Sequence, residues 1–123
     1  MSFLHTSKQP SQKIKSVVKE SYFQSQVIML AKLHGWLVMH TRAVEIRPGV
    51  WTTPLQGHAG FPDLVLAHET KGVLFAELKA DKNSRLSDMQ KVWLQTLKEA
   101  GMEVYVWRPK DIDTISRILA GTL

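Results

Sequence analysis

Three charged residues near the middle of the chain are the strongest candidates for chemistry: Asp63, Glu77 and Lys79. Asp63 precedes the apolar run LVLA, and Glu77 lies at the end of a second apolar run, VLFAE. If these runs form a hairpin that turns near Thr70, Asp63 lies seven residues before the turn and Glu77 seven residues after it. The two carboxylates are then expected to be cross-strand neighbours, with Lys79 facing the same way as Glu77.

Two opposed carboxylates repel each other, so the hairpin is expected to hold a compensating cation. Hard oxygen ligands suit Mg²⁺ or Mn²⁺, and the backbone carbonyl of Leu78 can supply a further ligand beside Asp63 and Glu77. Such a metal polarises a phosphate and activates water, while Lys79 orients or deprotonates that water, which is the chemistry of phosphodiester hydrolysis. The alternative is an ordinary exposed Glu–Lys pair at a strand end.

The elements that must position these residues follow from hydrophobic spacing and from helix and turn signals. We expect the order α-β-β-β-α-β-α, with helix 17–34, strands 36–40, 64–67 and 73–78, helix 87–100, strand 103–107 and helix 111–119. Residues 41–60 contain two prolines and three glycines and are predicted to be a long loop. Residues 1–16 are predicted to be a flexible basic arm, which leaves 17–123 as a single α/β domain.

The composition favours an anionic partner. The chain has a formal net charge of +5 and a pI of about 9.6, and such a surface attracts polyanions such as DNA. The absence of cysteine excludes disulfides, thiolate zinc sites and a cysteine nucleophile. No apolar run is long enough for a signal peptide or a membrane span, so a cytoplasmic protein is expected, with no membrane partner.

Several motifs together resemble one known family. They are GFPDLVL at 60–66, LFAELK at 74–79, Gln90 with Trp93-Leu94, and VYVWRP at 104–109, joined by ESYFQ at 20–24 and Gly35-Trp36. The chain is similar to the VRR-NUC family, the virus-type replication-repair nucleases of the PD-(D/E)XK superfamily. The likeness extends from about residue 19 to residue 119.

This resemblance implies a restriction-endonuclease-like αβββαβ core, in which a mixed sheet is flanked by helices. It implies a Mg²⁺- or Mn²⁺-dependent endodeoxyribonuclease with no nucleotide cofactor, expected in a bacterial or phage-infected cell. The sequence leaves the pathway open between repair, recombination, phage genome processing and defence. It also implies that a stand-alone domain of this kind forms a homodimer and cuts branched DNA, such as Holliday junctions or flaps. The competing interpretations are a non-catalytic DNA-binding module and a subunit of a larger restriction or recombination complex.

Two further polar residues have both a functional and a structural interpretation. Glu20 shares the apolar stripe of the first helix, and the resemblance implies that it is an accessory metal ligand; otherwise it is a first-turn Glu favoured by the helix dipole. Gln90 completes a capping box with Ser87 but also shares a helix face with Trp93, and in the family it borders the active site. For Gln90 both roles can hold in part.

Basic residues in the loops are candidates for binding DNA phosphates, although each alone can equally be a solvated surface charge. They are Arg42, Arg47, Lys82, Arg85 and Lys91. His40 and His58 lack the spacing of a zinc site. Trp51 either stacks at a DNA branch point or covers the core, and the second interpretation is favoured here.

Overall fold

The computed structural model of the chain describes residues 12–41, 44–52 and 56–122. Its elements occur in the order α1 (Gln12–Leu33), β1 (Leu37–His40), β2 (Val44–Arg47), β3 (Val50–Thr52), β4 (Leu64–His68), β5 (Gly72–Leu78), α2 (Asp88–Glu99), β6 (Glu103–Trp107), a single 3-10 turn η1 (Pro109–Asp111) and α3 (Ile112–Ala120). Among these described residues no helix is both long and apolar enough to cross a membrane.

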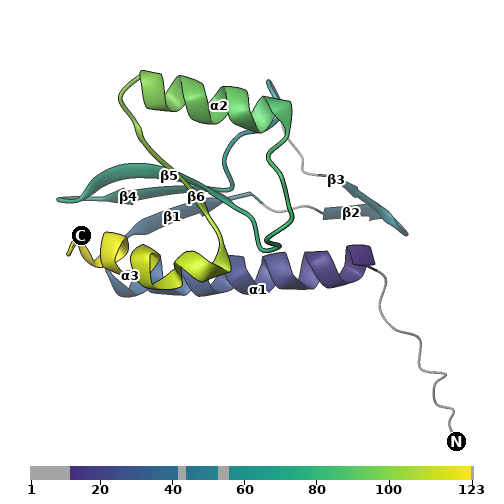
Figure 1. Cartoon of the computed structure of the whole chain (residues 1–123), viewed down its shortest axis with the longest axis horizontal. Helices are drawn as coiled ribbons and strands as arrows, with labels where there is room; N and C mark the ends of the chain where they lie inside the picture. Colours follow the sequence, from purple (N-terminus) through teal and green to yellow (C-terminus); the bar gives the residue numbers. More distant parts are fainter. Residues whose placement is uncertain (1–11, 42–43, 53–55, 123) are drawn as a thin grey trace, which may run out of the picture.

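The main sheet has four strands in the order β1-β4-β5-β6. Strands β1, β4 and β5 pair antiparallel, whereas β5 and β6 are parallel, so the sheet is mixed. Parallel neighbours need a crossover connection, and here the connection is α2. Helices α1 and α3 cover one face of the sheet, and α2 lies over the other (Figure 1). The predicted α/β fold, a mixed sheet flanked by helices, is confirmed.

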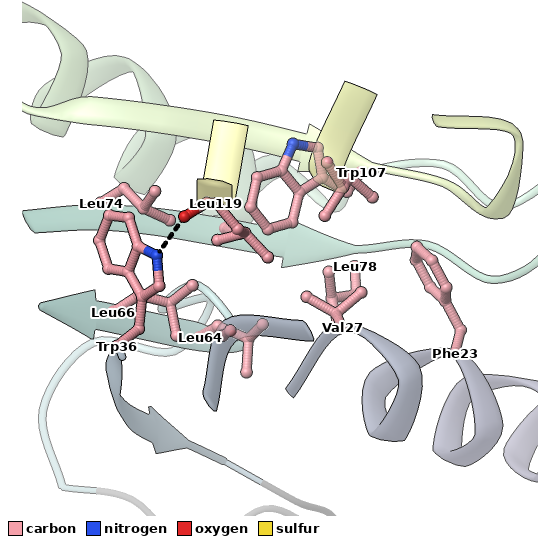
Figure 2. Packing of buried hydrophobic residues seen from close by; sticks show 12 residues of the cluster. Phe23, Val27, Trp36, Leu64, Leu66, Leu74, Leu78, Trp107 and Leu119 are labelled. Atoms are coloured by element: carbon pink, nitrogen blue, oxygen red, sulfur yellow. Dashed lines mark hydrogen bonds between the residues drawn. The ribbon is translucent and has the colours of Figure 1, made fainter. Parts of the chain in front are cut away.

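The hydrophobic core lies between the sheet and the α1/α3 layer, as Figure 2 shows. Phe23 and Val27 of α1 are buried in this core. The indole N–H of Trp36 donates a hydrogen bond of 2.9 Å to the carbonyl oxygen of Leu119. On β5 the buried apolar residues are the alternate positions Leu74, Ala76 and Leu78.

This alternation decides where the charged residues lie. Because successive strand residues point to opposite faces, burial of Ala76 and Leu78 against α1 turns Glu77 and Lys79 toward the α2 side of the sheet. The core therefore fixes the face on which the candidate chemistry takes place.

Helix α1 begins at Gln12, five residues before the predicted start at position 17, and ends at Leu33, next to the predicted end. Residues 1–11 of the predicted basic arm lie outside the described residues, and residues 12–16 belong to the helix. Helix α2 agrees closely with its prediction, because Ser87 caps it and Gln90 completes the capping box.

The prediction that residues 41–60 form one long loop is wrong. Strands β2 and β3 within it pair antiparallel and make a separate two-stranded sheet. Pro48 and Gly49 form the turn between them, and Gly49 has a φ of +78°, an arrangement typical of a type II turn. The proline and glycine that suggested a loop are thus the turn of a hairpin.

Candidate active site

The β4–β5 hairpin brings Asp63 and Glu77 together. The register pairs Leu64 with Ala76, so the next position outward places Asp63 opposite Glu77, as the spacing predicts. The side chain of Asp63 is fixed by a 2.8 Å hydrogen bond that its Oδ2 accepts from the backbone N–H of Leu78. Its own carbonyl oxygen accepts from the N–H of Thr41 at 3.1 Å, which ties β1 to the same corner.

Glu77 is buried, with only 2% of its surface exposed, and its two carboxylate oxygens differ. Oε2 accepts a 2.8 Å hydrogen bond from Nε2 of Gln90 and lies 3.7 Å from Nζ of Lys79. Oε1 is also buried, yet it has no hydrogen-bond partner in the described part of the chain. A buried, unpartnered carboxylate oxygen beside a second carboxylate is the arrangement expected of a metal ligand.

The electrostatics of the pair lead to the same expectation. Burial, followed by the negative charge of Asp63, raises the pKa of Glu77 from its ordinary value of 4.5 to about 8, although Lys79 acts in the opposite direction. Burial also raises the pKa of Asp63, against the stabilising hydrogen bond from Leu78. Without a cation the pair therefore retains a proton near neutral pH, and a divalent cation can take the place of that proton.

Glu20 lies near this pair but does not share its burial. Its side chain is exposed on α1. Loss of some solvent around the carboxyl, followed by the charge of Asp63, raises the pKa of Glu20, and Lys79 acts in the opposite direction. Among the described residues, no group of three His, Cys, Asp or Glu side chains lies close enough to hold a metal ion. The available donors are therefore two carboxylates and the carbonyl of Leu78, a set suited to Mg²⁺, which keeps several of its waters.

Gln90 makes hydrogen bonds that fit both of the interpretations that the sequence left open. Its Oε1 accepts a 2.8 Å hydrogen bond from the N–H of Ser87, and its own N–H donates to Oγ of Ser87 at 3.1 Å. The other end of the same amide, Nε2, donates to Glu77. The helix cap thus fixes a side chain that in turn orients a carboxylate of the site.

A cleft of about 770 Å³ opens beside Asp63 and Gln90. It is lined by Thr41, Thr52, Gln56, Gly57, His58, Ala59, Gly60, Phe61, Asp63, Gln90 and Trp93. One wall is the loop that leads into β4, where Gly60 has a φ of +93° and a Cβ would lie 2.6 Å from the backbone carbon of Met89. Only glycine lets this loop pack so closely against the start of α2.

Two aromatic contacts hold the same wall. The indole N–H of Trp93 donates a 2.9 Å hydrogen bond to the carbonyl oxygen of Ala59, and the ring of Phe61 meets Trp93 edge-on at a centroid distance of 4.9 Å. Trp93 therefore shapes the cleft. His58 lines the cleft as well, whereas the sequence assigned it no role.

Arg108 is a residue whose role the sequence analysis missed. Its guanidinium donates 2.8 Å hydrogen bonds to the carbonyl oxygens of both Asp81 and Ser84. These residues belong to the connection between β5 and α2, so Arg108 fixes the segment that follows Lys79. In the sequence, only the position of Arg108 directly after Trp107 hints at this role. The hint can be used once β6 is known to pair with β5, because Trp107 then lies beside Leu78.

The predicted DNA-binding residues are spread around the site. Lys82 and Arg85 are exposed on the connection held by Arg108, and Lys91 is exposed next to Gln90. Arg47 is exposed on β2, and Arg42 lies outside the described residues. Trp51, favoured as a cover of the core, is instead 41% exposed on β3. That prediction is wrong because β3 pairs with β2 outside the main sheet.

The architecture places the protein in the class of VRR_NUC-like α/β domains. A solved structure titled "VRR_NUC domain" matches with a TM-score of 0.60 and 23% identity, covering 79% of this chain and 92% of its own. A second, titled "VRR_NUC domain protein", matches with a TM-score of 0.56 and 25% identity, covering 81% of this chain and 84% of its own.

The family follows from the sequence match. The family model described as the VRR-NUC domain matches residues 39–111, and the chain belongs to this nuclease family. The predicted resemblance is thereby confirmed, and a nuclease-like, DNA-processing domain is established at that level. A comparison with curated proteins gave no match.

Proposed function

We propose that the protein is a metal-dependent endonuclease that hydrolyses DNA phosphodiester bonds. The observation that carries this proposal is the buried Glu77, whose Oε1 is unpartnered while Asp63 lies opposite and Lys79 lies 3.7 Å from Oε2. A domain that only bound DNA would gain nothing from two carboxylates there, since they repel phosphate.

In this proposal Asp63, Glu77 and the carbonyl of Leu78 would hold Mg²⁺ or Mn²⁺. Glu20 does not form a three-carboxylate group with them in this structure, so it would serve as an accessory ligand only when its exposed side chain turns toward the ion. The ion, when bound, supplies charge stabilisation at the phosphate and lowers the pKa of bound water. Gln90 keeps the Glu77 carboxylate in position through its 2.8 Å hydrogen bond.

Lys79 acts on the other reactant. Its amine orients the attacking water in the site and meets the negative charge that develops on the phosphate oxygens. Water attacks the phosphorus and gives up one proton to the surrounding solvent, while the bond to the leaving sugar oxygen breaks and that oxygen takes up a proton from solvent water. The side chain of Lys79 is 13% exposed, so it can act from within the site while remaining accessible to substrate.

We further propose that the preferred substrate is branched DNA, such as a four-way junction or a flap, and that a homodimer cuts it. A domain of 14.0 kDa offers one such site, whereas symmetric cutting of a junction needs two. Lys82, Arg85 and Lys91 are proposed to hold phosphates beside the site, with Arg47 on the hairpin.

The test is a panel of labelled junction, flap, splayed-arm, single-stranded and linear duplex DNA, incubated with Mg²⁺, with Mn²⁺ and with EDTA. Nicking that requires the metal and is fastest on a branched substrate is the expected result. Binding without nicking under any of these conditions would contradict the proposal and favour a non-catalytic DNA-binding module. Light scattering on the protein without DNA should give a mass near twice 14.0 kDa.

A further inference from the structure

The β2–β3 hairpin is a small structure of its own beside the candidate site. Its strands pair only with each other, and the main sheet contains neither of them. In Figure 1 the hairpin projects beyond the main sheet, at the end of the molecule where α1 begins. Thr52 of β3 lines the same cleft as Asp63, so the hairpin forms part of the boundary of that cleft.

The hairpin has two faces. Thr52 lines the cleft, and because successive strand residues point to opposite faces, Trp51 is directed away from the cleft. Trp51 is 41% exposed, and Glu45 pairs directly across from it, so these two side chains share the outer face. The outer face therefore presents an aromatic ring that the described part of the molecule leaves in solvent.

The described part of the hairpin carries one exposed acidic residue and one exposed basic residue. Glu45 pairs across from Trp51, but its Oε2 accepts a 3.1 Å hydrogen bond from the N–H of Gly49, which directs the carboxylate toward the turn. Arg47 is exposed at the end of β2 and can contact a phosphate.

We propose that this hairpin is a wedge that separates two strands at a DNA branch. The strand to be cut lies in the cleft beside Thr52, and the ring of Trp51, on the other side of the hairpin, stacks on an unpaired base of the second strand. Stacking on an aromatic ring is tolerant of sequence, because every base has a π-face. Linear duplex offers no unstacked base, so Trp51 contributes to selectivity for branched DNA. This inference rests on the proposed nuclease function.

The first experiment measures binding without cleavage. In EDTA, the affinities of wild type, Trp51→Leu and Trp51→Phe are compared on a splayed-arm substrate and on linear duplex. Trp51→Leu, apolar but without a ring, is expected to bind the branched DNA about tenfold more weakly, which is the loss of one stacked base, and to bind duplex unchanged. Trp51→Phe should remain close to wild type. Met29→Ala, which alters a side chain 67% exposed on α1, is the matched surface control.

A second measurement uses the same three proteins with a fluorescent base in the DNA. 2-Aminopurine is placed at the branch point, and its fluorescence is expected to be quenched on binding by wild type and Trp51→Phe but not by Trp51→Leu. Equal weakening on branched and linear DNA, or quenching that persists in Trp51→Leu, would overturn the wedge. So would a fall in oligomer mass in that variant, which would place Trp51 between two copies of the chain.

Failure of the proposed nuclease function and failure of the wedge would give different results. If wild type cuts no substrate with either metal, the metal-dependent chemistry is wrong, but binding and quenching still decide whether Trp51 meets a base. If wild type cuts and Trp51→Leu keeps the same ratio of branched to linear cleavage, the wedge alone is refuted.

Discussion

At the scale of single residues, replacing either carboxylate of the site should have a different effect on cleavage and metal binding from replacing Lys79. Asp63→Ala and Glu77→Ala remove proposed metal ligands, and both are expected to abolish cleavage while DNA binding persists. Lys79→Ala should slow cleavage by about 10²–10⁴-fold yet leave metal affinity intact, because the amine acts on water and phosphate. Single-turnover cleavage and metal titration of each variant separate these outcomes. Wild-type cutting by Asp63→Ala would show that the metal site lies elsewhere.

The carboxylate pair also gives the metal-free protein a distinctive pH dependence. Folding raises the pKa of Glu77 from 4.5 to about 8, so the folded state binds a proton more tightly than the unfolded chain. The stability that this group contributes is complete below about pH 4.5 and is lost as the pH rises toward about 8. Urea unfolding in EDTA should therefore show a falling midpoint across this range. In Glu77→Gln the urea midpoint should fall less over this pH range than in wild type. If the midpoint of the variant fell as steeply as that of wild type, Glu77 would be ionised throughout the range.

At the scale of elements, Arg108 joins β6 to the connection that follows the candidate catalytic strand. Its fork of N–H groups bonds the carbonyls of Asp81 and Ser84, and a lysine cannot reproduce two such bonds. Arg108→Lys is expected to lower cleavage by about tenfold, since a misplaced connection disturbs Lys79 and the neighbouring phosphate contacts. Arg117→Lys, an exposed change on α3, is the control. Faster amide exchange confined to residues 81–85 would accompany the loss, and unchanged exchange there would contradict the explanation.

The helices and strands also show which parts of the structure could be predicted from the sequence. The β4–β5 hairpin and the cap of α2 were predictable because alternation and a capping box are local signals. The β2–β3 hairpin was missed because its strands have only four and three residues around a Pro-Gly turn. The role of Arg108 could not be inferred, because it depends on parallel pairing between strands separated by a helix. The orientation of Glu20 likewise depends on how α1 packs against the sheet.

At the scale of the whole molecule, ligand binding and folding should be linked through the same pair of carboxylates. An ion that binds only the folded chain stabilises it, by about 2.7 kcal/mol at a hundredfold excess over its Kd. Mg²⁺ or Mn²⁺ should therefore raise the melting temperature of wild type and of Met29→Ala, but not of Glu77→Ala.

This linkage predicts an effect of pH on the metal itself. Binding must displace the proton that Glu77 retains below its pKa of about 8, so metal affinity should increase as the pH rises toward that value. Calorimetry in buffers of different ionisation enthalpy would measure the released proton directly. Glu77→Gln should release none, because its side chain carries no such proton. Binding with no proton release by wild type at neutral pH would mean that the metal does not replace the proton shared near Asp63, and that the ligands must be sought outside this pair.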